Sequence, residues 1–235
     1  MKHRLVLVLG LMMSLLVAST SVAAATTTLD IDAIADSVTT ADIPTLIDGL
    51  AKPIAVRDLP ADFTDATYID STSKTEMKGA TCVYDASTTT LQGAAAYELT
   101  VDPDAGDFTK ACASINYLVY TEEELGNDPL GDYREGLVTS LAAEPGTPDE
   151  NGGVAEVDDI TVAGADAILF TYSITNGPKS ATVQVLATVV GNVLVLTQIQ
   201  TQGEDEITSK TLAPISKELM EAAIVHLGEV ADKAQ

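Results

Sequence analysis

Residues 165–201 read ADAILFTYSITNGPKSATVQVLATVVGNVLVLTQIQT, and this stretch decides the fold. Two runs in it alternate every second residue, which is the period of a strand with one buried face. In the first run the alternating sets are Ile168, Phe170, Tyr172 and Ile174 against Leu169, Thr171 and Ser173. Asn176-Gly177 and Gly191-Asn192 are typical of tight hairpin turns. With Val193–Thr201 as the last strand, the stretch predicts a three-stranded antiparallel meander.

The elements on either side of the meander complete an α+β fold. Val154–Val162 is expected to add a fourth strand that reverses at Gly164. A helix is expected from Pro214 onward, because proline suits a first helical turn. Its apolar stripe consists of Ile215, Leu219, Ala222, Ala223, Leu227 and Val230. This stripe must cover a sheet face, which predicts an antiparallel sheet packed against a C-terminal amphipathic helix in a two- or three-layer sandwich.

The middle of the chain is predicted in outline. Ala80–Tyr84 and Ala94–Val101 have strand composition, whereas Thr64 to Lys78 is polar. The segment from 107 to 120 fits a helix or a strand, and both interpretations stay open. The remaining elements are a helix at Asp132–Ala143 and a surface loop at Glu144–Gly153.

The beginning of the chain has the pattern of a cleavable secretion signal. Lys2, His3 and Arg4 precede an apolar run of 14 residues and then a series of small residues ending at Ala25. A helix that spans a bilayer needs roughly 20 apolar residues, so we expect cleavage and no stable membrane insertion afterwards. The domain layout is therefore a signal peptide at 1–25, a helical N-terminal extension at 26–56 and a single α+β sandwich domain at 57–235.

The net charge excludes two classes of partner. The chain has 35 acidic and 12 basic residues and a formal charge of −23, which becomes −25 once Lys2 and Arg4 are removed. Nucleic acids and anionic membranes bind through lysine and arginine, so neither is an expected partner. The acids are spread along the chain, which is typical of a solvated surface and leaves open the capture of cations or of a basic partner.

Cys82 and Cys112 are the two cysteines of the chain. In an oxidising compartment outside the cytoplasm they are expected to pair. Two cysteines do not make a zinc site, because zinc needs two more ligands and the part after residue 25 has a single histidine. The alternative is a pair of buried free thiols.

Signatures of catalysis are absent from the sequence. It contains no GxxxxGK[ST], GxGxxG, GxSxG or HExxH motif. His226 falls within the apolar stripe of the last helix, where it is either a packed neutral side chain or a base that lines a pocket. Asp102, Asp104 and Asp107 are candidate calcium ligands, although their spacing lacks the closing glutamate of a calcium loop. We expect no cofactor.

The order of the elements resembles a known family. The domain opens with Leu59-Pro60-Ala61-Asp62-Phe63 and closes with Ile160–Ile168, two hairpins and an amphipathic helix. This arrangement is similar to the PsbP-like α/β/α sandwich of small exported proteins, including LpqN-type lipoproteins, over roughly residues 57–228. The resemblance implies a non-catalytic accessory or binding module, but it supplies no functional residues. The chain departs from it by lacking a lipid-attachment cysteine and by carrying residues 26–52 and 121–150.

Three functions follow as hypotheses. The first is a secreted or periplasmic, non-catalytic module that binds an unknown protein or a small apolar ligand. The second is a calcium-dependent surface module that uses the acidic segments at 102–107 and 121–132. The third is an extracellular hydrolase with His226 as its base.

Overall fold

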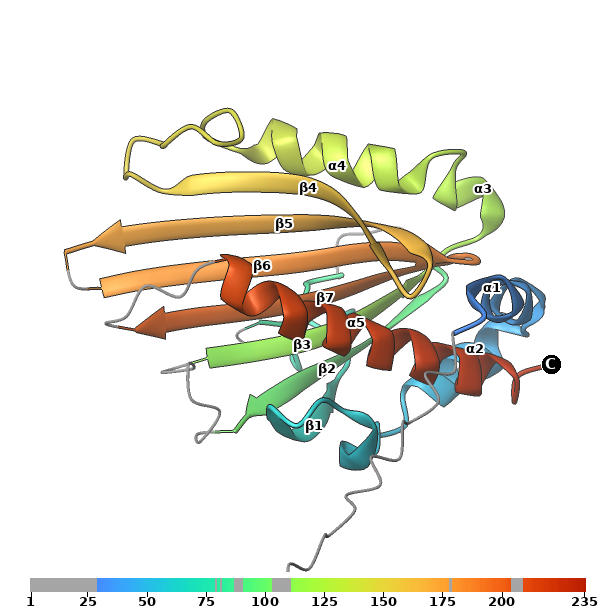
Figure 1. The fold of residues 1–235 in the computed structure, drawn as a ribbon. Coiled ribbons are helices and arrows are strands. Elements are labelled where there is room, and N and C mark those ends of the chain that lie inside the picture. The colour runs from blue at the N-terminus through green and yellow to red at the C-terminus, as the bar shows by residue number, and fades with distance from the viewer. Residues whose placement is uncertain are drawn as a thin grey trace, which may run out of the picture.

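The computed structural model describes residues 29–78, 80, 82–86, 91–102, 111–177, 179–203 and 209–235. Their central element is a seven-stranded antiparallel sheet in the order β1-β2-β3-β7-β6-β5-β4. Its strands are β1 (Phe63–Ile69), β2 (Gly93–Val101), β3 (Ala111–Val119), β4 (Val154–Val162), β5 (Ala165–Asn176), β6 (Lys179–Val190) and β7 (Val193–Gly203). The helices are α1 (Ile31–Thr40), α2 (Ile43–Leu50), the 3-10 turn η1 (Val56–Asp58), α3 (Glu122–Leu125), α4 (Pro129–Ser140) and α5 (Ser209–Ala231). Figure 1 shows the long helix α5 lying across one face of the sheet.

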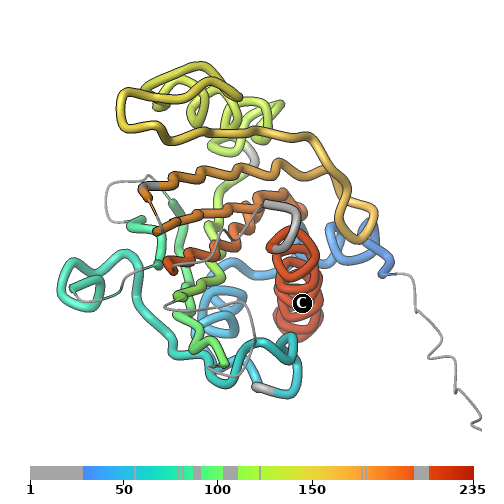
Figure 2. The backbone as a smooth tube through the Cα atoms, turned by 60° about the vertical axis from the view of Figure 1, so that its left-hand side comes forward, coloured from blue at the N-terminus to red at the C-terminus, as the bar shows by residue number. Residues whose placement is uncertain are grey.

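The sheet is covered on both faces, which makes a three-layer arrangement. On the first face, α5 packs with α1 and α2 over inward-facing residues such as Leu186 and Ile199. On the second face, Leu130 and Tyr133 of α4 pack on a smaller cluster that includes Leu118 and Leu196. Residues 82–86 lie over this second face as well, on the side of the sheet away from α5 (Figure 2).

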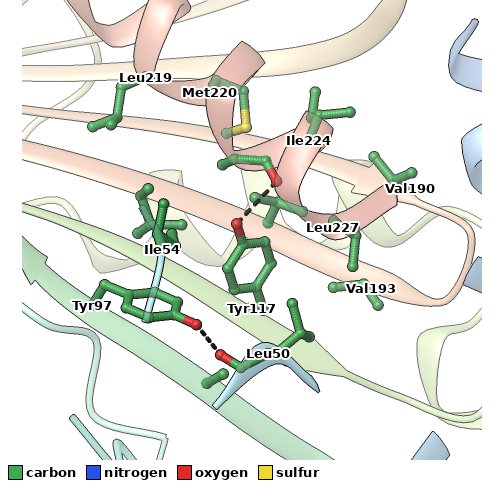
Figure 3. Packing of buried hydrophobic residues seen from close by; sticks show 14 of the residues in the cluster. Leu50, Ile54, Tyr97, Tyr117, Val190, Val193, Leu219, Met220, Ile224 and Leu227 are labelled. Carbon is green, nitrogen blue, oxygen red and sulfur yellow. Dashed lines mark hydrogen bonds between the residues drawn. The ribbon is translucent and has the colours of Figure 1, made fainter. Parts of the chain in front are cut away.

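The main core lies under α5 (Figure 3). Its buried helix residues are Leu212, Leu219, Met220, Ala223, Ile224, Leu227, Val230 and Ala231. Two buried tyrosines place their hydroxyls among these apolar residues. Tyr117 donates to the carbonyl of Ala223 at 2.9 Å, and Tyr97 donates to the carbonyls of Leu50 and Lys52. A buried hydroxyl without an acceptor would destabilise the fold, so these bonds fix where α5 and the end of α2 meet the sheet.

The predicted meander and fourth strand are confirmed, with one shift. In the β5–β6 hairpin, Asn176 pairs with Lys179 and belongs to β5, so the turn begins at Gly177 and not at Asn176. Gly177 has a φ of 63°. A glycine at the first turn position satisfies the chain reversal on its own, so Asn176 stays in the strand.

For the middle of the chain, one strand was not predicted, one prediction is wrong and one alternative is resolved. β1 overlaps the polar segment that begins at Thr64, for which no strand was predicted, and its register shift between Phe63 and Asp65 explains why. The bulge puts the buried residues Phe63 and Ala66 three positions apart, which breaks the alternation. Residues 80 and 82–84 form no strand, contrary to expectation, whereas the ambiguous segment contains the strand β3.

The helices largely match their predicted positions. The extension before residue 57 is helical, with Asp42 capping α2 and Pro44 in its first turn. The helix predicted at 132–143 is α4 at Pro129–Ser140. The last helix begins at Ser209, so Pro214 lies in its second turn and not in its first.

The β4–β5 turn offers a stabilising substitution. Ala163 and Gly164 have φ values of 53° and 90°, and Ala163 is the non-glycine residue with positive φ among the described residues. A left-handed conformation costs an L-residue about 1–2 kcal/mol. We therefore expect Ala163→Gly to raise the free energy of unfolding by about 0.5–1 kcal/mol in denaturant titrations. Ala165→Gly, in the adjacent strand, should lower it by a similar amount. Equal losses in the two variants would contradict this explanation.

Candidate functional site

A cleft of about 310 Å³ lies between the end of α2, the segment that follows it and the C-terminal half of α5. Gly49 of α2 touches Val230 of α5 so closely that a Cβ at Gly49 would overlap the valine side chain. Beyond this contact the chain turns away through Lys52 and Pro53 to η1, and the cleft opens between the two elements. Its lining consists of Thr45, Gly49, Lys52, Pro53, Ala55, Arg57, Asp58, His226, Glu229, Val230 and Lys233.

His226 forms part of the inner wall of this cleft. The imidazole is half-buried between α5 and the sheet, and its ring centroid lies 6.1 Å from those of both Tyr97 and Tyr117. Its Nε2 atom is buried without a hydrogen-bond partner among the described residues. Burial lowers the pKa of His226, Lys233 adds to this effect, and Glu229 and Asp58 oppose it. At neutral pH the imidazole is therefore uncharged.

The charged residues of the lining are unusual for so acidic a chain. Three cations, Lys52, Arg57 and Lys233, face two carboxylates, Asp58 and Glu229. Arg57 and Asp58 pair with each other, Nε to Oδ1, at 3.3 Å. Within the described part of the chain, Lys52 and Lys233 make no ion pair or side-chain hydrogen bond. Both ammonium groups are therefore available to an anion that enters the cleft.

The cleft does not assemble a nucleophile with His226. Thr45 supplies the hydroxyl group of the lining, and this hydroxyl donates to Asp42 at 2.6 Å. The lining residues include neither serine nor cysteine. A base needs a nucleophile or a water-activating partner within hydrogen-bond reach, so this geometry gives no support to the hydrolase hypothesis.

The candidate calcium ligands are not brought together in the described chain. Asp102 follows β2, where its backbone N–H donates to the carbonyl of Asp62 at 2.8 Å, and Asp104 and Asp107 lie outside the described residues. No group of three or more histidine, cysteine, aspartate or glutamate side chains suited to a metal occurs among the residues that are described. The acidic segment at 121–132 has a structural role instead. Glu124 and Thr121 form a capping box on α3, and Asp128 caps α4.

The two cysteines form the predicted disulfide, with their Cα atoms 6.0 Å apart. Cys112 lies on β3 and faces away from α5. Two further contacts hold the Cys82 segment on that face. Ser114 donates to the carbonyl of Cys82 at 2.8 Å, and the backbone N–H of Tyr84 donates to the Asn116 amide oxygen at 2.9 Å. The disulfide thus attaches a surface segment to the second face, far in the fold from the cleft under α5.

His226 should contribute to the pH dependence of the protein's stability. We expect its imidazole to titrate below the usual value of 6.5, because burial disfavours the charged form. A lowered pKa in the folded state means that the unfolded chain binds the proton more readily. The contribution of His226 to stability is then complete above about pH 6.5 and is lost as the pH falls toward the folded-state pKa. NMR titration of the ring protons tests this, and a pKa at or above 6.5 would contradict it.

The comparisons with known proteins assign neither a family to the chain nor a ligand to the cleft. No protein-family model matches the chain, and no curated protein matches it. Among solved structures, PA94 of Pseudomonas aeruginosa, a protein of unknown function, is 16% identical and covers 53% of this chain and 86% of its own, with a TM-score of 0.27. A mutant of the protein Mog1 is 13% identical and covers 65% of this chain and 82% of its own, also with a TM-score of 0.27. Within the described residues, no helix has both the length and the apolarity to cross a membrane.

Proposed function

We propose that this protein is an exported, non-catalytic binding module whose ligand occupies the cleft between α2 and α5. The observation that carries the proposal is the cleft itself, which combines an uncharged, half-buried histidine with two lysines that have no partner among the described residues. Ligand sites are concave and combine apolar walls with a few convergent polar groups. The resemblance to PsbP-like accessory modules agrees with this function, and it stays a prediction.

Obstruction of the cleft tests the proposal. Ala55 is exposed and lines the cleft, so Ala55→Trp fills space there without entering the core. Ala142→Trp places the same side chain at an exposed position after α4 and serves as the control. A small-molecule library would be screened by thermal shift with the wild type, and each hit repeated on both variants. Hits that raise the melting temperature equally in Ala55→Trp would overturn the cleft as the binding site.

The non-catalytic part of the proposal has its own test. We expect broad esterase, peptidase and glycosidase assays to give no turnover with the purified protein. Should turnover appear, the same assays on His226→Ala show whether the histidine is responsible. An activity that disappears with His226 would replace the binding function with the hydrolase.

Export is tested at the N-terminus. The basic start, short apolar run and small residues up to Ala25 favour removal by a signal peptidase. We expect N-terminal sequencing of the protein from the extracytoplasmic fraction to begin at Ala25 or Thr26. Recovery of a chain that begins at Met1 in the membrane fraction would contradict both cleavage and release.

A further inference from the structure

We infer that the cleft recognises a small organic monoanion, a carboxylate attached to a short apolar body. This inference rests on the proposed binding function and adds the chemical class of the ligand. Its basis is the meeting of two helix ends. Lys52 follows the end of α2 and Lys233 follows the end of α5, and the packing of the two helices directs both residues to one cleft.

The charges of the lining favour one negative charge. Because Arg57 and Asp58 pair with each other, Lys52, Lys233 and Glu229 remain, with one positive charge in excess. The rest of the protein is strongly acidic, but salt at physiological concentration screens charges beyond about 8 Å. The local lining therefore decides which ions enter. A cationic ligand would leave both ammonium groups unpaired, and a monoanion would pair with them.

A stabilising role at the helix ends accounts for only part of this arrangement. Lysine near a helix C-terminus interacts favourably with the helix dipole, which explains why lysine follows α2 and α5. It does not explain why both lysines line the same cavity, or why both lack an acceptor among the described residues in a chain with 35 acids. Ligand binding supplies the missing acceptor.

The same helix ends discriminate against phosphate. Phosphate sites commonly use the N–H groups at the start of a helix. This cleft lies at two C-termini, which carry a partial negative charge, and Glu229 adds to that charge. A dianion meets more repulsion here than a carboxylate, whose single charge matches the lining.

The uncharged residues of the lining determine which group the carboxylate of the ligand can carry. Gly49, Pro53, Ala55 and Val230 form apolar walls, and the half-buried imidazole of His226 closes the inner side. The volume of about 310 Å³ is at the lower end for ligand sites. It fits one ring or a short chain and excludes a long acyl chain.

Three probes of matched shape test the ligand class. Benzoate, benzyl alcohol and benzylamine would be titrated into the full-length mature protein and followed through backbone amide NMR signals of the cleft. Lys52→Gln combined with Lys233→Gln removes the two ammonium groups. Lys74→Gln combined with Lys179→Gln makes the same change in net charge at exposed positions outside the cleft.

We expect benzoate to shift the cleft signals and to bind about tenfold more weakly in the cleft double variant, with less than about a twofold change in the control. Equal or tighter binding of the alcohol or the amine in the same cleft would overturn the carboxylate class and leave the binding site intact. If the affinity for benzoate falls equally in both double variants, the change in net charge explains the loss, and Lys52 and Lys233 do not recognise the ligand. Absence of cleft shifts with all three probes would overturn this inference, while the library screen with Ala55→Trp judges the binding function separately.

Discussion

Replacing Gly191 with alanine should be among the most destabilising single substitutions in this protein, with a loss of about 2–5 kcal/mol. Gly191 is the first turn residue between β6 and β7 and has a φ of 59°, a conformation that costs an L-residue about 1–2 kcal/mol. A Cβ at this position would also lie 2.8 Å from the carbonyl oxygen of Ala35 and 2.9 Å from the Thr39 hydroxyl oxygen, both in α1. Forcing atoms into such packed space costs about 1–3 kcal/mol more.

Gly177 supplies a matched control for the turn conformation. Its φ is 63°, close to that of Gly191, but an added Cβ would meet nothing within 4 Å. Gly177→Ala should therefore lose only the conformational part, about 1–2 kcal/mol. Denaturant titrations of both variants give the difference, which is the contribution of close approach by α1.

The location of the damage in Gly191→Ala can be measured as well. The hairpin cannot move away from the sheet without breaking its pairing with β3, so we expect α1 to shift or detach first. Hydrogen exchange should then become faster in Ile31–Thr40 than in the strands. Equal losses of stability in the glycine variants at 177 and 191 would show that α1 does not depend on this contact.

The strands of the meander could be predicted because their period of two is visible in the local sequence. The face that lies under α5 could not be predicted in the same way. On that face of β6 the buried residues are Thr182, Gln184, Leu186, Thr188 and Val190, whereas the more apolar set at 181, 183, 185 and 189 is only half-buried on the opposite face. β1 could not be predicted this way, because its bulge changes the spacing of the buried residues. The prediction of a strand at 80–84 failed for a tertiary reason. β3 already pairs with β2 on one side and β7 on the other, so the Cys82 segment lies over the sheet and cannot join it there.

Of the residues that line the candidate cleft, the sequence indicates only His226. It is the single histidine after residue 25, and it lies on the apolar face of a predicted helix. Lys52 and Lys233 are 181 positions apart, and nothing in their local sequence indicates that they meet. Their meeting depends on the approach of α2 to α5 at Gly49 and Val230, which is set by side-chain packing. The capping role of Glu124 could have been predicted from the sequence, because Thr121 and Glu124 have the spacing of a capping box.

Removal of the Cys82–Cys112 disulfide should cost about 2–4 kcal/mol of stability and leave the fold intact. The bond closes a loop with a sequence separation of 30 residues, and a loop of this size restricts the unfolded chain by about 3.5 kcal/mol in the entropy model. In the folded state, the contacts of Ser114 with the Cys82 carbonyl and of Asn116 with Tyr84 remain. We therefore expect the segment to stay on the second face in the Cys82→Ala/Cys112→Ala double variant.

The denaturation midpoint measures the loss, and a second variant separates the two sources of stability. Ser114→Ala keeps the disulfide but removes the hydrogen bond to Cys82, which should cost about 1 kcal/mol. The loss of stability caused by Ser114→Ala should be larger in the double cysteine variant than in the wild type. Without the disulfide, the hydrogen bond has a larger share in holding the segment, so the two contributions are coupled. Thiol labelling of the denatured wild type provides the direct check. Two reactive thiols in protein from an oxidising compartment would contradict the bond, and a double cysteine variant as stable as the wild type would contradict its role in stability.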